Sequence, residues 1–197
     1  MTNTIRFAEP RDAAVVQAIY APFCDGSAVS FEAAPPSVEQ IAERIARILP
    51  QYPWLVAEID GRVAGYVYGC QHRERAAYRW TVDVTVYIDA NRHRRGIGRA
   101  LYTSLLAMLR AQGFFKAYAG VTLPNPASVG LHEALGFVPV AVYRGEGYKL
   151  GQWRDVGWWQ LDLQPEVAEP PEPTPINALR AAPAIAAALA AGQALLG

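Results

Sequence analysis

Cysteine is scarce in this chain of 197 residues, where Cys24 and Cys70 are the two cysteines. Two cysteines cannot form a disulfide scaffold or a four-ligand zinc site, so we expect neither a disulfide framework nor a metal. An apolar signal core is also missing from residues 1–7. We therefore expect a reduced, cytoplasmic protein.

The chain also lacks an excess of charge of either sign, because its 18 basic residues balance 18 acidic ones. A formal net charge of zero disfavours non-specific electrostatic binding to nucleic acid, and we expect no nucleic-acid partner. Lysine is limited to Lys116 and Lys149, and arginine supplies the other basic groups. Arginine is the better bidentate ligand for carboxylate and phosphate, although a GC-rich codon habit explains the same bias.

Long apolar runs are absent, and the C-terminal segment after Pro183 is shorter than the roughly 20 residues that span a bilayer. Five prolines within residues 164–175 block helix and central strand, which predicts an extended linker. We therefore divide the chain into a domain, 1–163, a Pro-rich linker, 164–175, and an Ala-rich tail, 176–197, and exclude the last two from the fold. We expect a mobile tail or a short helix docked on a neighbour, and no membrane partner; a membrane or partner anchor is the alternative.

The body of the chain alternates between strand-like and helix-like segments, and its 52% hydrophobic residues suffice for a core. Helices are predicted after Pro10, after Ser37 and after Asn125, and over residues 97–112. Strands are predicted over residues 5–8, 54–59, 62–68, 79–88, 117–122, 138–144 and 156–163. This order indicates the α/β (α+β) class.

The segment 79–88 alternates strictly between two kinds of side chain. Its even positions are apolar and would face the core: Trp80, Val82, Val84, Val86 and Ile88. Its odd positions are mostly polar and form a candidate functional face: Arg79, Thr81, Asp83, Thr85 and Tyr87.

A basic, glycine-containing turn follows that strand and opens a helix. It reads His-Arg-Arg-Gly-Ile-Gly-Arg over residues 93–99. Glycines expose backbone N–H groups, and the start of a helix carries partial positive charge, so a pyrophosphate is its expected ligand. The candidate cofactor-binding residues here are Arg94, Arg95, Gly96, Ile97, Gly98 and Arg99.

This turn resembles the phosphate loop of the GNAT acyltransferase family, whose pattern is Arg/Gln-x-x-Gly-x-Gly/Ala at the same junction. His93 occupies the first position and departs from that pattern. A second match is the segment 125–137, which begins at Asn125 and ends in Gly-Phe. His132 stands where many members have the tyrosine that acts on the leaving thiolate.

Further segments are similar to the phosphinothricin and methionine sulfoximine N-acetyltransferases of that family: 52–58, 77–82, 131–136, 147–149 and 155–157. The match covers roughly residues 4–163. It implies a mixed, mostly antiparallel sheet of six to seven strands with helices on both faces. It also implies an acetyl-CoA-dependent enzyme, a small amino-acid-like acceptor and a homodimer.

The resemblance also implies roles for individual residues. Asp83 stands where the relatives have a glutamate base, and His132 would assist proton transfer. The residues implied for the acceptor are Arg73, Arg75, Tyr78 and Thr85, and those for the pantetheine arm are Val86, Tyr87, Ile88 and Asn125. The plainer alternatives are that Asp83 pairs with an arginine such as Arg79 or Arg75, that residues 86–88 make ordinary sheet pairs, and that Asn125 is only a helix cap.

We therefore expect a direct attack of the acceptor amine on acetyl-CoA in a ternary complex, because no cysteine lies in a motif that suits an acyl-enzyme. The alternatives are an N-acetyltransferase for another amine, such as a peptide N-terminus, polyamine or aminoglycoside, and a non-catalytic acetyl-CoA-binding module. Arg73 and Arg75 disfavour a polyamine, which would require an acidic lining.

Overall fold

The computed structural model describes residues 3–197; Met1 and Thr2, which belong to the predicted domain 1–163, lie outside the described residues. Within the described part, seven strands form one sheet in the order β1-β2-β3-β4-β5-β7-β6. The strands are β1 (Thr4–Phe7), β2 (Trp54–Ile59), β3 (Arg62–Gln71), β4 (Thr81–Ile88), β5 (Lys116–Thr122), β6 (Val138–Lys149) and β7 (Gln152–Asp162). In this sheet β4 and β5 are the parallel pair and the other neighbours are antiparallel, which confirms the predicted mixed sheet.

Helices cover both faces of the sheet, as predicted. On one face α1 (Ala13–Asp25) and α2 (Val38–Ile48) enclose a core that includes Trp54 and Tyr66. On the other face α3 (Ile97–Gln112) packs on the alternate strand residues, such as Val82 and Val84. The remaining helices are α4 (Pro126–Ala134), α5 (Ile176–Leu179) and α6 (Pro183–Gln193), and single 3-10 turns occur at Pro10–Asp12, Ala76–Tyr78 and Ala90–Arg92.

Local sequence signals fix several boundaries. Ser37 caps α2 by accepting from the Gln40 N–H at 3.2 Å, and Gln40 Oε1 accepts from the Ser37 N–H at 2.8 Å. Asp60 and Gly61 have φ values of 53° and 76°, the left-handed geometry of a tight hairpin turn between β2 and β3. The predicted spans for β2 and α3 are confirmed to the residue.

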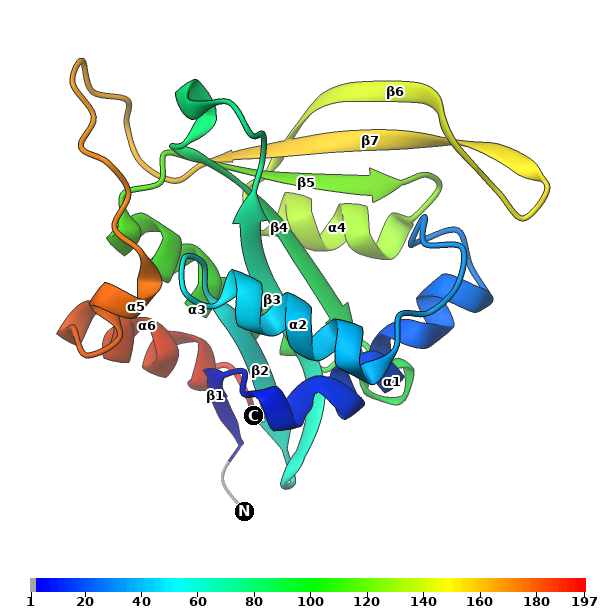
Figure 1. Cartoon of the computed structure of the whole chain (residues 1–197), viewed down its shortest axis with the longest axis horizontal. Helices are drawn as coiled ribbons and strands as arrows, with labels where there is room; N and C mark the ends of the chain where they lie inside the picture. Colours follow the sequence, from blue (N-terminus) through cyan, green and yellow to red (C-terminus); the bar gives the residue numbers. More distant parts are fainter. Residues whose placement is uncertain (1–2) are drawn as a thin grey trace.

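The C-terminal segment departs from the expectation that the fold ends near residue 164. Ile176 and Ile185 are fully buried, and both belong to the core on the α3 face. Gly192 lies against Ala100 and Ser104, so a small residue allows α6 to approach α3 closely. Figure 1 shows α5 and α6 beside α3 and β1. Of the two expected forms, a mobile tail and a docked short helix, the structure has a docked helix, but one that packs on the domain's own core. Its sparse apolar residues bury a narrow stripe that composition alone does not reveal.

The β6–β7 hairpin is longer than predicted. Its strands extend to Lys149 and from Gln152, around a turn in which Leu150 and Gly151 have φ values of 54° and 75°. The glycines at 145 and 147 weaken any strand prediction there. Gly147 lies against the Phe31 ring, where a side chain would collide. Figure 1 shows the hairpin projecting past the end of β5.

No helix within residues 3–197 combines the length and the apolar character that crossing a membrane requires.

Candidate active site

The parallel strands β4 and β5 separate part of the way along their length. They pair from Thr81–Lys116 to Asp83–Tyr118, but β4 continues to Ile88 and β5 to Thr122. A cavity of about 100 Å³ lies where they diverge. We call it the β4–β5 cleft; its lining includes residues 84–87 of β4, residues 119–122 of β5, and Val29, Tyr102, Asn125, Ser128 and His132.

The backbone of β4 is open toward this cleft. The Asp89 N–H donates to the Ala64 carbonyl at 2.9 Å, on the side of β3. Because backbone groups alternate sides along a strand, those of residues 84, 86 and 88 point away from β3, toward the diverging side. Val86 and Ile88 therefore offer free amides, whereas Tyr87, the register partner of Tyr66, directs its amide to β3. The Tyr87 ring packs on Tyr20 at 4.8 Å.

The glycine-containing turn leads from β4 into α3. Arg94 and Gly96 have φ values of 60° and 75°, so the backbone turns through the left-handed region directly before the helix. The amides of residues 97–99 have no partner inside the helix, as at any helix start. The Ile97 side chain is buried in the core and can offer only its backbone, whereas Arg94, Arg95 and Arg99 are exposed. The divergent part of β4 thus leads into a turn and a helix start whose backbone N–H groups also lack partners within the sheet or helix.

His132 lies in α4, behind the cleft and on the α3 side of the sheet. Its Nδ1 lies 2.8 Å from the Ser128 carbonyl oxygen, and its Nε2 lies 2.9 Å from the Tyr102 hydroxyl. Nδ1 therefore donates, and Nε2 accepts from Tyr102. Burial lowers the pKa of His132, which favours the neutral ring. Asn125 accepts from the Ser128 N–H at 3.1 Å, so it caps α4 while also lining the cleft.

Asp83 does not pair with Arg75 or Arg79 within the described residues, so the plainer alternative of an arginine partner is wrong. Its Oδ1 lies 2.6 Å from Nδ1 of His72, a residue that sequence analysis missed. Burial raises the pKa of Asp83, and the hydrogen bond and charge of His72 partly oppose that shift. Gln71 pairs with Val82, so His72 lies just past the hairpin ladder, diagonal to Asp83. Only the register of β3 against β4 could have signalled this contact.

The predicted acceptor residues line a second pocket, of about 240 Å³, which we call the arginine pocket. Its lining includes Arg73, Arg75, Tyr78, Arg79, Thr81 and Glu172. Arg79 forms an ion pair with Glu172 of the C-terminal segment, and the Trp80 indole N–H donates to the Pro171 carbonyl at 2.7 Å. Thr85, also predicted for the acceptor, lies instead in the β4–β5 cleft.

A loop between α1 and α2 covers one end of the cleft. Val29 lines the cleft, and the Val29 carbonyl accepts from the Thr122 hydroxyl at 3.3 Å. Lys149, at the end of β6, donates to three carbonyl oxygens of this region: Cys24 at 2.5 Å, Ser30 at 2.6 Å and Glu32 at 2.8 Å. This ammonium therefore fixes the loop to the projecting hairpin.

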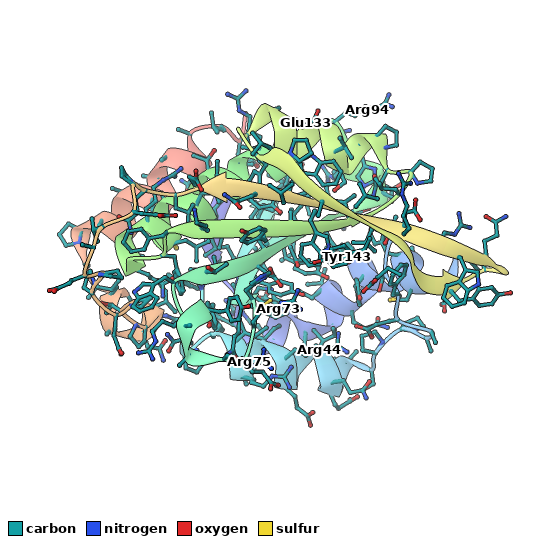
Figure 2. All side chains as sticks on the ribbon, turned by 90° about the horizontal axis from the view of Figure 1, so that it is seen from above. Arg44, Arg73, Arg75, Arg94, Glu133 and Tyr143 are labelled. Atoms are coloured by element: carbon teal, nitrogen blue, oxygen red, sulfur yellow. The ribbon has the colours of Figure 1, made fainter. Side chains whose placement is uncertain are left out.

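The two groups of candidate residues lie on opposite sides of the sheet. In Figure 2, Arg94 lies near Glu133 of α4, whereas Arg73 and Arg75 lie on the opposite side with Arg44 of α2. A ligand at the glycine-containing turn and a ligand at the arginine pocket would thus approach from different sides and meet along β4.

The fold, together with the comparisons below, is that of an acyltransferase that uses acetyl-CoA as co-substrate. A family model described as an acetyltransferase (GNAT) domain matches residues 5–158, and the chain belongs to the GNAT acetyltransferase family. The match omits α5 and α6.

Characterised relatives and solved structures agree with this assignment. Phosphinothricin N-acetyltransferase of Streptomyces viridochromogenes is 43% identical over 169 residues, 86% of this chain and 91% of that protein. An L-methionine sulfoximine/L-methionine sulfone acetyltransferase of Salmonella typhimurium is 34% identical and covers 84% and 97% of the two chains. A phosphinothricin acetyltransferase of Sinorhizobium meliloti, crystallised with acetyl-CoA, superposes with a TM-score of 0.81 at 34% identity, covering 88% and 94%.

Proposed function

We propose that the protein acetylates the amino group of a small amino-acid-like acceptor such as phosphinothricin or methionine sulfoximine. The observation that carries the proposal is the end of β4–β5 pairing at Asp83. The carboxylate lies at that point, between the β4–β5 cleft and the arginine pocket. The names of the relatives support the acceptor class, since both kinds of acceptor appear among them.

We infer that acetyl-CoA supplies an activated acetyl group as a thioester when it is bound. The amides of residues 96–99 would hold its diphosphate, assisted by Arg94, Arg95 and Arg99. The free amides of Val86 and Ile88 would bind the pantetheine and polarise the carbonyl that is attacked. Asn125 and Tyr87 complete the wall of this site.

Arg73, Arg75 and Tyr78 would hold the acceptor carboxylate and its distal end, because a zwitterion requires a cation for its carboxylate. Asp83 would attract the ammonium group and promote its deprotonation, and Thr85 would contact the acceptor. His132 would assist proton transfer on the leaving-thiol side. Both its ring nitrogens are already bonded, so the proton would pass through the Tyr102 or Ser128 hydroxyl.

A thiol-release assay tests this function. Phosphinothricin, methionine sulfoximine and methionine sulfone should each release coenzyme A faster than an aminoglycoside, a polyamine or a peptide N-terminus. Faster release with one of the latter three would reassign the acceptor. Acetyl-CoA binding without turnover of any amine would instead favour a non-catalytic module.

We also propose a homodimer and a cytoplasmic location. Apolar side chains remain exposed on β6 and at the hairpin tip: Val138, Val140, Val142, Tyr148, Leu150 and Trp153. Such a patch is typical of an interface between copies. Cys24 and Cys70 are both free thiols, which suits a reducing compartment. Sedimentation analysis should give twice the monomer mass, and a monomer at micromolar concentration would contradict the dimer.

A further inference from the structure

His72 is held in one orientation by contacts on several sides. Its ring stacks on Tyr118 of β5 at 4.8 Å with 16° between planes. The rings of Tyr78 and Trp158 form T-shaped pairs with it, with centroids 6.1 and 6.2 Å away. Its side chain is 12% exposed, and Nδ1 lies 2.6 Å from Asp83 Oδ1. A surface loop residue rarely receives this much support.

The second ring nitrogen of His72 is available. Within residues 3–197, Nε2 makes no hydrogen bond, and it is not among the sealed polar atoms that lack a partner. When Nδ1–H donates to the Asp83 carboxylate, the lone pair of the neutral ring lies on Nε2. A carboxylate that orients an imidazole in this way is the arrangement of a general base and its orienting acid group.

The pair also lies at the right place along β4. Thr81 lines the arginine pocket, Thr85 lines the β4–β5 cleft, and Asp83 lies between them on the same strand face. Alternate residues of a strand are about 7 Å apart. An amine that is held from the arginine pocket and directed to the cleft would therefore pass beside the His72–Asp83 pair.

We propose that His72 is the catalytic base that takes the proton from the acceptor ammonium, and that Asp83 is the positioning residue that orients it. This inference rests on the proposed function and deepens it. Asp83 is one methylene shorter than the glutamate that the family resemblance implies at this position. The His72 imidazole, bonded to the Asp83 carboxylate, would extend the base toward the acceptor and compensate for the missing methylene.

The proposed step removes two protons from the acceptor nitrogen and exchanges a carbon–sulfur bond for a carbon–nitrogen bond. His72 Nε2 accepts one proton from the ammonium, and Asp83 stabilises the resulting imidazolium. The amine nitrogen then forms a bond to the acetyl carbon while the carbon–sulfur bond breaks. The second nitrogen proton ends on sulfur, and the imidazolium returns its proton to water.

Other titratable or charged groups face this pair from each neighbouring element. They are Cys70 of β3, Tyr118 of β5, and Arg73 and Tyr78 of the same loop as His72. Burial raises the pKa of Cys70 to about 12, so this thiol stays protonated over the working range. Burial also raises the pKa of Tyr118, and Arg73 keeps its charge. Neither Cys70 nor Tyr118 would therefore compete as the base over the working pH range.

Two conservative variants test the proposal. His72→Asn keeps a donor for Asp83 without a base, and His72→Phe keeps the stack on Tyr118 without either nitrogen. Both should lower kcat/KM for the acceptor by about 100-fold or more at pH 7, the lower range of general-base effects. Affinity for acetyl-CoA, measured by calorimetry, should change less than about twofold because no step at the cofactor is altered.

Three readouts separate a base from a structural group. The rising limb of kcat/KM with pH should shift in both variants to the alkaline range in which the free amine becomes abundant, and added imidazole should partly restore His72→Ala. The kinetic limb should also coincide with the titration of the His72 ring protons followed by NMR in the unmodified protein. That measurement needs no variant to fold.

The outcomes distinguish this inference from the function on which it rests. An active protein whose His72→Asn variant keeps both its rate and its pH profile would overturn the role of His72 and leave the acetyltransferase function intact. A protein that binds acetyl-CoA but acetylates no amine would overturn both.

Discussion

The two sides of the candidate active site present different chemical groups. On the side that we propose for the cofactor, backbone groups would provide the binding surface: the open edge of β4 and the turn at Gly96. On the acceptor side, charged and aromatic side chains converge, among them Arg73, Arg75 and the His72–Asp83 pair. This difference teaches that substitutions on the cofactor side should act through backbone geometry, whereas those on the acceptor side should act through chemical identity.

The largest effect is expected at Asp83. Asp83→Asn should lower kcat/KM for the acceptor by about 100-fold or more at pH 7, since proton removal by a positioned group contributes that much. Burial raises the pKa of Asp83, so the unmodified protein should lose activity on acidification at a higher pH than an ordinary aspartate would cause. In the variant, the rate should rise with pH as the free amine becomes more abundant. Thiol release between pH 5 and 9.5 provides the measurement, and an unchanged rate at pH 7 would remove Asp83 from the mechanism.

Arg75 should give the next largest effect, confined to the acceptor. A lost charge-assisted bond of about 1.5–3 kcal/mol corresponds to about a 10- to 150-fold rise in the acceptor KM for Arg75→Ala. Arg79→Ala is the matched control, because its guanidinium already pairs with Glu172. Steady-state kinetics in both substrates decides the matter: equal rises in the acceptor and acetyl-CoA constants would refute the anchoring role.

A substitution at Gly96 should lower the affinity for acetyl-CoA by changing the backbone geometry of the turn. The Gly96 φ of 75° is costly for alanine, by about 1–2 kcal/mol, so Gly96→Ala should weaken acetyl-CoA binding by about 5- to 30-fold. Arg95→Ala should weaken binding less and in a salt-dependent way, since an exposed charge is screened. Calorimetric titration at low and high salt compares the two. If Arg95→Ala lowers the affinity for acetyl-CoA more than Gly96→Ala does, side chains and not backbone geometry dominate cofactor binding.

Lys149 should give the smallest effect on catalysis and a measurable effect on stability. Lys149→Met leaves three carbonyls without their ammonium donor, at an expected cost of about 1–3 kcal/mol in unfolding free energy and a few-fold rise in the acceptor KM. Lys116→Met is the matched control, because Lys116 makes exposed pairs with Asp162 and Glu166 that are worth about 0–1 kcal/mol. Urea unfolding of both variants tests this, and equal losses of stability would show that the Lys149 contacts are not special.

The fold was largely predictable because its signals are local. The alternation of residues 79–88 and the caps at Ser37 and Asn125 each depend on a few neighbouring residues. The docking of α6 was not predictable, because it depends on a narrow stripe, including Ile185 and Gly192, that fits one groove of α3.

The local conformation of the candidate site was predictable only in part. The turn at Gly96 was predicted because its glycines precede a strong helix; the positive φ values of Arg94 and Gly96 confirm a turn there, and its role in binding stays a prediction. His72 was not predicted as a site residue, because no neighbouring sequence motif indicates a role for it. It meets Asp83, 11 residues away, only through the register of β3 on β4. The alternative of an arginine partner for Asp83 was wrong, because the partner that the register supplies is His72.

A crystal structure with coenzyme A and a methionine sulfoximine acceptor tests the account most directly. We expect the diphosphate at the amides of residues 96–99, the sulfur in the β4–β5 cleft, and the acceptor nitrogen within hydrogen-bond reach of His72 Nε2. A diphosphate elsewhere on the surface, or an acceptor nitrogen remote from both His72 and Asp83, would contradict it.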